Sequence, residues 1–165
     1  TGKVYIQNPP RVLQMRGGAA EKALVTRLAG NRLPNAVRAD GDLPVASIPD
    51  NSADFAITAM NLHDVYNLPN GATIAQGLLK NVYSMLKPGG VFGVMDHAGV
   101  AAGDNTNLHR MQKQQAIDVA KAAGFVVDAE SNLLANASDD HTKMVFDPTL
   151  RGKTDQFVLR LRKPK

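Results

Sequence analysis

The sequence contains no cysteine among its 165 residues, and this absence excludes several kinds of site at once. Without a thiol there is no disulfide framework, no thiolate metal site, no cysteine nucleophile and no iron–sulfur cluster. The same absence leaves the compartment open, because a chain without thiols is stable in oxidising and in reducing surroundings. The cytoplasm and the bacterial periplasm are both compatible with it.

Long apolar runs and a large charge excess are missing as well. No stretch reaches the roughly 18 apolar residues of a transmembrane helix, so we expect no contact with a membrane. Nineteen lysines and arginines stand against 15 acidic residues, which gives a net charge of +4. Several of the basic residues alternate near the C-terminus, as on a solvated strand face. Because no aromatic residues interleave a basic patch, we expect no nucleic-acid binding.

The hydrophobic pattern predicts one α/β domain over residues 1–165. The strands and helices alternate almost to the end, which is typical of a mainly parallel sheet. The last two strands lack a helix between them, so one of them is expected to be antiparallel. The polar segment 131–154 is too long for a passive connection and is predicted to be a loop or lid. The expected strands are 3–7, 36–39, 53–60, 91–95, 125–130 and 155–161, and the expected helices are 19–28, 71–86 and 107–123.

Three of the four histidines adjoin an aspartate. These pairs are His63-Asp64, Asp96-His97 and Asp140-His141. Ligands of open α/β sheets bind outside the carboxyl ends of the strands, and the first two pairs follow predicted strands. A carboxylate that reaches an imidazole fixes its tautomer and raises its basicity. We therefore expect His63 and His97 to act as general bases, with Asp64 or Asp96 as the orienting carboxylate.

The two remaining histidines differ in their setting. His141 lies in the 131–154 loop, which would close over a site, so it is a further catalytic candidate. His109 is expected to cap or stack at the start of a helix instead. The same histidines and aspartates would suit zinc or a non-haem metal, but their spacing is scattered and lacks a His-x-x-x-His pair. We therefore expect no metal site.

Two stretches of the chain together resemble a known family. Residues 38–44 read Arg-Ala-Asp-Gly-Asp-Leu-Pro, and residues 48–57 read Ile-Pro-Asp-Asn-Ser-Ala-Asp-Phe-Ala-Ile. They resemble a signature of class I S-adenosylmethionine-dependent methyltransferases. Residues 86–92, Leu-Lys-Pro-Gly-Gly-Val-Phe, resemble the turn before that family's fifth strand. The resemblance covers most of residues 1–130. The tail, with Ser131, Asp139 and residues 151–157, is similar to small bacterial predicted methyltransferases of unassigned substrate.

The resemblance implies a Rossmann-like sheet with an antiparallel last strand. It also implies methyl transfer from S-adenosylmethionine to a small-molecule acceptor of unknown identity. Asp40 would bind the adenine amino group, with Gly41 allowing close approach, and Asn8 would meet the ribose hydroxyls. Asn61 follows the family's fourth strand, where family members place substrate and catalytic groups.

One departure from the family concerns its glycine-rich cofactor loop, which would precede Thr1. The family's first strand and helix would then be missing, and the chain would be a fragment of a longer enzyme or a shortened form. Unpaired edges of central strands are costly, so three outcomes are open: further residues precede Thr1 in the natural protein, other strands of the sheet pair directly, or a second copy fills the gap in a homodimer. If the chain is complete as given, the affinity for S-adenosylmethionine should be weak or lost.

Two other functions use the same scaffold. One is a hydrolase of small esters or lactones that employs the histidines and aspartates, with or without a metal. Because the sequence has no Gly-x-Ser-x-Gly motif, such an enzyme would need water as its nucleophile. The other is a non-catalytic dimeric remnant of an enzyme.

Overall fold

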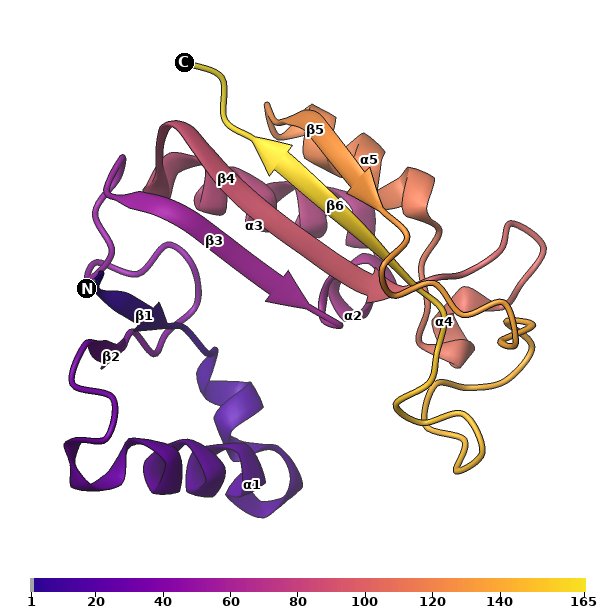
Figure 1. Ribbon diagram of the computed structural model, residues 1–165, viewed down its shortest axis with the longest axis horizontal. Coiled ribbons are helices and arrows are strands. Elements are labelled where there is room, and N and C mark those ends of the chain that lie inside the picture. Colours follow the sequence, from indigo (N-terminus) through magenta and orange to yellow (C-terminus); the bar gives the residue numbers. More distant parts are fainter. Residues whose placement is uncertain (1) are drawn as a thin grey trace. The chain divides into compact units, whose positions relative to one another are not determined.

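The computed structural model describes residues 2–165. The chain forms two compact units, called here the N-terminal unit and the C-terminal unit, which are divided between Pro49 and Asp50 (Figure 1). Within the described residues, no helix is both long and apolar enough to cross a membrane.

The N-terminal unit is built on two short parallel strands, β1 (Val4–Ile6) and β2 (Ala36–Arg38). Helix α1 (Pro10–Leu28) and the 3-10 helix η1 (Ala29–Asn31) connect them (Figure 1). This connection agrees with the predicted strand–helix–strand order.

Helix α1 begins at Pro10, nine residues before the predicted helix 19–28. Proline suits the first turn of a helix because the N–H that it lacks would have no partner there. The backbone leaves helical geometry at Met15, and Gly17 and Gly18 adopt left-handed φ angles of 66° and 76°. The element is therefore two helical pieces joined at a glycine kink, of which the second matches the prediction.

The C-terminal unit holds a four-stranded sheet in the order β3-β4-β6-β5. Strand β3 (Ala53–Ala59) is parallel to β4 (Leu86–His97). Strand β6 (Gln156–Arg162) is antiparallel both to β4 and to β5 (Val126–Ser131). The predicted α/β architecture with an antiparallel last strand is confirmed.

The core of the C-terminal unit lies between this sheet and two helices, α3 (Gly71–Met85) and α5 (Lys113–Ala122), which lie on the same side of the sheet (Figure 1). Helical spacing places apolar residues three and four apart on one face, and strand alternation sends every second residue of β4 and β6 toward them. The buried side chains of these elements include Ala75, Leu79, Val82, Ile117, Phe92, Val94, Leu159 and Leu161.

The described residues form two sheets instead of one, and the break falls between β2 and β3. Strand β3 forms an edge of its sheet, and its Phe55 and Ile57 side chains are 57% and 58% exposed. A homodimer through this edge stays a prediction.

The helices of the C-terminal unit differ from the prediction at two places. The single helix expected over 107–123 is divided into α4 (Asn105–Leu108) and α5, because His109 takes a left-handed φ of 55° after α4. The short helix α2 (Leu62–Tyr66) was not predicted. A five-residue helix is too short for hydrophobic periodicity to reveal.

Candidate functional site

The carboxyl ends of β3 and β4 bring together the histidines that follow them. Helix α2 starts directly after β3 and carries His63, while β4 ends with Asp96 and His97. The Nδ1 atom of His63 lies 2.6 Å from Oδ1 of Asp96, and the His63 backbone N–H donates to Oδ2 over 2.9 Å. The backbone N–H of His97 donates to Oδ1 of the same carboxylate over 2.8 Å. The fully buried Asp96 thus fixes the position of both histidines.

The two histidines have opposite electrostatic surroundings. Burial alone would lower the pKa of His63, but the carboxylates of Asp64 and Asp96 outweigh it and raise the pKa to about 9. Burial lowers the pKa of His97, and the neighbouring His63 adds to the effect. The adjacent His63 ring, whose Nε2 atom lies 3.2 Å from Oδ1 of Asp64, lowers the pKa of the Asp64 carboxyl. The Nδ1 atom of His97 lies 2.7 Å from the hydroxyl of Thr154, which orients that ring.

His109 belongs to the same group, although the sequence analysis placed it at the start of a helix. It lies at the end of α4, and its left-handed backbone ends that helix. Its Nδ1 atom is 3.1 Å from Oδ1 of Asp64. The His63 ring centroid is 5.8 Å from that of His109 and 5.4 Å from that of His97. We call these residues the histidine cluster: His63, Asp64, Asp96, His97 and His109.

The sequence did contain a feature that could have revealed the position of His109. Asp104 caps α4, accepting a hydrogen bond from the backbone N–H of Asn107. Asparagine is a weak helix former, and Asn107 stands at the start of the predicted helix. A short, separately capped helix was therefore an alternative to one long helix.

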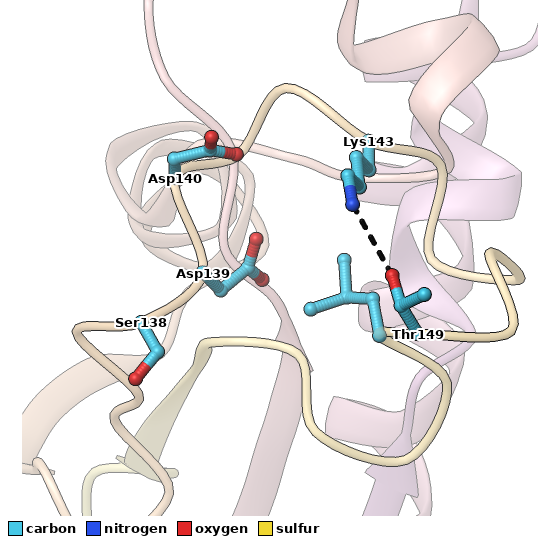
Figure 2. A pocket seen from close by; sticks show the side chains of 6 residues that line it. Ser138, Asp139, Asp140, Lys143 and Thr149 are labelled. Atoms are coloured by element: carbon cyan, nitrogen blue, oxygen red, sulfur yellow. Dashed lines mark hydrogen bonds between the residues drawn. The ribbon is translucent and has the colours of Figure 1, made fainter.

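His141 is placed differently from the cluster. Its Nε2 atom lies 2.9 Å from Oδ2 of Asp155, and no hydrogen bond, ion pair or ring contact within residues 2–165 joins His141 to the histidine cluster. The surrounding loop has a small polar pocket of its own, in which Lys143 donates to the Thr149 hydroxyl over 3.2 Å (Figure 2). The role of His141 in catalysis stays a prediction.

The residues predicted to bind the cofactor nucleoside lie mainly in the N-terminal unit, at the carboxyl ends of β1 and β2. The backbone N–H of Gly41 donates to the Asn8 carbonyl over 3.0 Å, and the Gln7 side chain donates to the Gly41 carbonyl over 2.6 Å. Arg38 donates to Oδ2 of Asp40 over 2.7 Å. These bonds join the two strand ends into one corner, which we call the Asp40 corner.

The Asp40 corner presents accessible polar groups. The Asp40 side chain is 29% exposed, so its carboxylate is accessible as an acceptor for an amino group. The half-buried Asn8 adds an amide that can bond hydroxyl groups. A Cβ atom on Gly41 would lie 2.9 Å from a methyl group of Val45, so this turn requires glycine. Asn61 lies apart from this corner in sequence, at the N-cap position of α2.

No protein-family model and no curated protein matches the chain. Solved structures do match. The [4+2]-cyclase SpnF has a TM-score of 0.63 at 16% identity over 99% of this chain and 75% of its own. A SAM-dependent methyltransferase from Aquifex aeolicus has a TM-score of 0.62 at 15% identity, covering 98% of this chain and 69% of its own.

A third similar structure is an S-adenosylmethionine-dependent methyltransferase from Mesorhizobium loti. Its TM-score is 0.57 at 15% identity, and the match covers 98% of this chain and 81% of that protein. The chain therefore has the class I S-adenosylmethionine-dependent methyltransferase fold, as the sequence resemblance implies. The same fold also occurs in a cyclase, so the fold alone does not determine the activity.

Proposed function

We propose that the protein transfers a methyl group from S-adenosylmethionine to a small-molecule acceptor. The Asp40 corner is the observation that carries this proposal, because it places a partly exposed carboxylate and an amide at the carboxyl ends of two parallel strands. That edge is where open α/β sheets bind their ligands. The fold agrees with it, since two of the similar solved structures are methyltransferases.

On the cofactor side, Asp40 accepts a hydrogen bond from the adenine amino group. Its Oδ2 atom is held by Arg38, which in turn forms two hydrogen bonds with the Glu21 carboxylate of α1. This network fixes the Asp40 carboxylate in advance, so little conformational entropy is lost when the nucleoside binds. Asn8 bonds the ribose hydroxyls. When bound, the cofactor supplies an electrophilic methyl group on a positively charged sulfur.

On the acceptor side, the histidine cluster positions the nucleophile and takes up its proton. Methyl transfer forms one bond from the acceptor to carbon and breaks the sulfur–carbon bond, whose electron pair stays on sulfur. An acceptor that carries a proton has to lose it, and His97 is the proposed recipient. Because its Nδ1 atom is engaged by Thr154, Nε2 is the ring nitrogen that accepts the proton. Asp96 holds the His97 backbone in place.

Calorimetric titration with S-adenosylmethionine tests the proposal. The protein should bind the cofactor, and Asp40→Ala should weaken binding at least tenfold, which corresponds to about 1.4 kcal/mol. Asp42→Ala is the matched control, because this exposed carboxylate lies two residues away and should leave the affinity unchanged. If millimolar cofactor produces no heat and no thermal shift, the proposal of methyl transfer is rejected. Hydrolysis of simple esters by the same sample would then support the hydrolase alternative.

A further inference from the structure

The Nε2 atom of His63 is a buried nitrogen whose bonding is incomplete. The residue is 3% exposed, and its other ring nitrogen is engaged by Asp96. Nε2 lies 3.2 Å from Oδ1 of Asp64, yet no group in the described chain meets it with hydrogen-bond geometry. Leaving a buried polar atom unsatisfied costs roughly 1–3 kcal/mol, so native structures rarely contain one without a reason.

Neither proton state of His63 resolves this by itself. If Nε2 carries a proton, the ring forms an ion pair with Asp64 at 3.2 Å, but the proton lacks a well-aligned acceptor. If Nε2 carries a lone pair, that pair faces the Asp64 carboxylate, and two acceptors repel each other. A cation placed among these atoms is a partner for both the Nε2 lone pair and the Asp64 carboxylate, since a neutral imidazole nitrogen and a carboxylate oxygen are each metal ligands.

A third ligand atom converges on the same point. Oδ1 of Asp64 also lies 3.1 Å from Nδ1 of His109, and the three ligand atoms all lie within 4.8 Å of one another. Ligands that surround a zinc ion tetrahedrally at about 2.0–2.2 Å are about 3.4 Å apart. The two shorter separations are close to this value, so small side-chain rotations suffice to coordinate an ion.

The surroundings of His63 are those of a metal-bound histidine. Metal-ligating histidines commonly donate their second ring N–H to a carboxylate, which fixes the tautomer and directs the other nitrogen at the ion. Asp96 occupies this position, 2.6 Å from Nδ1 of His63, and is itself held by the backbone of His97. The Phe146 ring packs against His109 at a centroid distance of 5.0 Å and limits its movement.

We infer that His63, Asp64 and His109 form a binding site for a divalent transition metal of the zinc type, with Asp96 orienting His63. Two imidazoles and one carboxylate make a borderline donor set, which favours zinc or cobalt over magnesium or calcium. Three protein ligands leave the fourth tetrahedral position open for water or for an oxygen of a substrate. This site requires no nucleoside, so it stands independently of methyl transfer.

Spectroscopic titration of the untagged full chain with Co²⁺ tests the site. Visible bands of tetrahedral Co²⁺ should appear at one equivalent, and Zn²⁺ should displace them. His109→Ala and Asp64→Asn should each weaken Zn²⁺ binding at least tenfold in calorimetry. Both changes are at partly exposed side chains, so the fold should survive, as circular dichroism can verify.

His141→Ala is the matched control, because His141 also contacts a carboxylate, at 2.9 Å, but residues 2–165 place no third ligand beside it. It should bind metal like the wild type. The inference is overturned if millimolar Co²⁺ or Zn²⁺ gives no binding, or if His109→Ala and Asp64→Asn bind as tightly as the unmodified protein. Since these titrations contain no S-adenosylmethionine, their failure is distinct from failure of the proposed function.

Discussion

The Arg110 guanidinium and the Asp139 carboxylate form two parallel hydrogen bonds of 2.9 Å each, with both side chains almost completely buried. Arg110 also donates to the Ala98 carbonyl beyond β4 and to the Lys143 carbonyl in the loop. This pair therefore attaches the 131–154 loop to the end of β4, next to the histidine cluster.

Removal of one partner of this pair should be strongly destabilising. Asp139→Ala leaves the Arg110 charge buried without a counter-ion, so we expect a loss of about 3–5 kcal/mol in the free energy of unfolding. Asp140→Ala, at an exposed neighbour, should cost less than about 1 kcal/mol. Urea denaturation of the two variants measures the difference. Equal losses would show that the buried ion pair is not what holds the loop.

The same pair makes stability depend on pH in the acid range. Burial alone would raise the pKa of Asp139, but hydrogen bonds from Arg110 and two backbone N–H groups outweigh it and lower the pKa below 3.8. The folded state then binds fewer protons than the unfolded state, so this stabilisation is complete above pH 4 and declines as the pH falls through the folded pKa. Thermal unfolding from pH 7 to pH 2 should show a steeper acid decline for the wild type than for Asp139→Asn.

Two glycines of α3 should respond in opposite ways to alanine. A Cβ atom on Gly71 would lie 1.8 Å from the Tyr66 carbonyl oxygen, whereas one on Gly77 would meet nothing within 4 Å. Gly71→Ala should therefore lower the free energy of unfolding by about 1–3 kcal/mol, because the backbone has to shift. Gly77→Ala should increase the free energy of unfolding by about 0.5–1 kcal/mol, because alanine has the higher helix propensity. Chemical denaturation distinguishes the two, and a stabilising Gly71→Ala would contradict the close packing of α2 against α3.

The ammonium group of Lys163 connects three segments of the C-terminal unit. It donates to Oδ1 of Asn51 and to the carbonyls of Tyr83 and Leu86, at 2.8, 2.9 and 2.8 Å. Lys163→Met keeps the chain length but leaves these acceptors unpaired, so we expect a loss of about 2–3 kcal/mol. Lys121→Met, at an exposed position of α5, should change the free energy of unfolding by less than about 0.5 kcal/mol. Guanidinium denaturation should show this contrast, and similar midpoints would argue against the role of Lys163.

The sequence predicted the elements with strong periodicity and missed those set by tertiary contacts. Helix α3 was predicted within one residue because its apolar residues recur regularly and Pro88 ends the pattern. Helix α1 begins earlier than predicted, because Pro10 occupies its first turn and Pro9 is its N-cap residue. The break at His109 was missed because the apolar spacing runs on through it, although Asp104 supplies a local cap for a short separate helix.

The candidate site was predicted in part for a related reason. Because β3 and β4 are parallel neighbours, their carboxyl ends meet at one edge of the sheet, and this brings His63 near Asp96. The order of the strands gives no information on residues that reach this edge of the sheet from other elements, as His109 does from the end of α4. Adjacency in sequence predicted the histidine–aspartate contacts only in part. His63 contacts Asp64, but its shortest carboxylate contact is with Asp96, 33 residues away.

The scarcity of buried apolar residues in the N-terminal unit has a consequence for its motions. Only Ala39 and Val45 of the described core belong to it, and α1 buries none of its side chains fully. Amide protons there should exchange with heavy water much sooner than those of β4 and β6, because local opening is inexpensive where little apolar surface is sequestered. A nucleoside captured at that corner would slow the exchange, so the ligand itself would complete the ordering of the segment that recognises it.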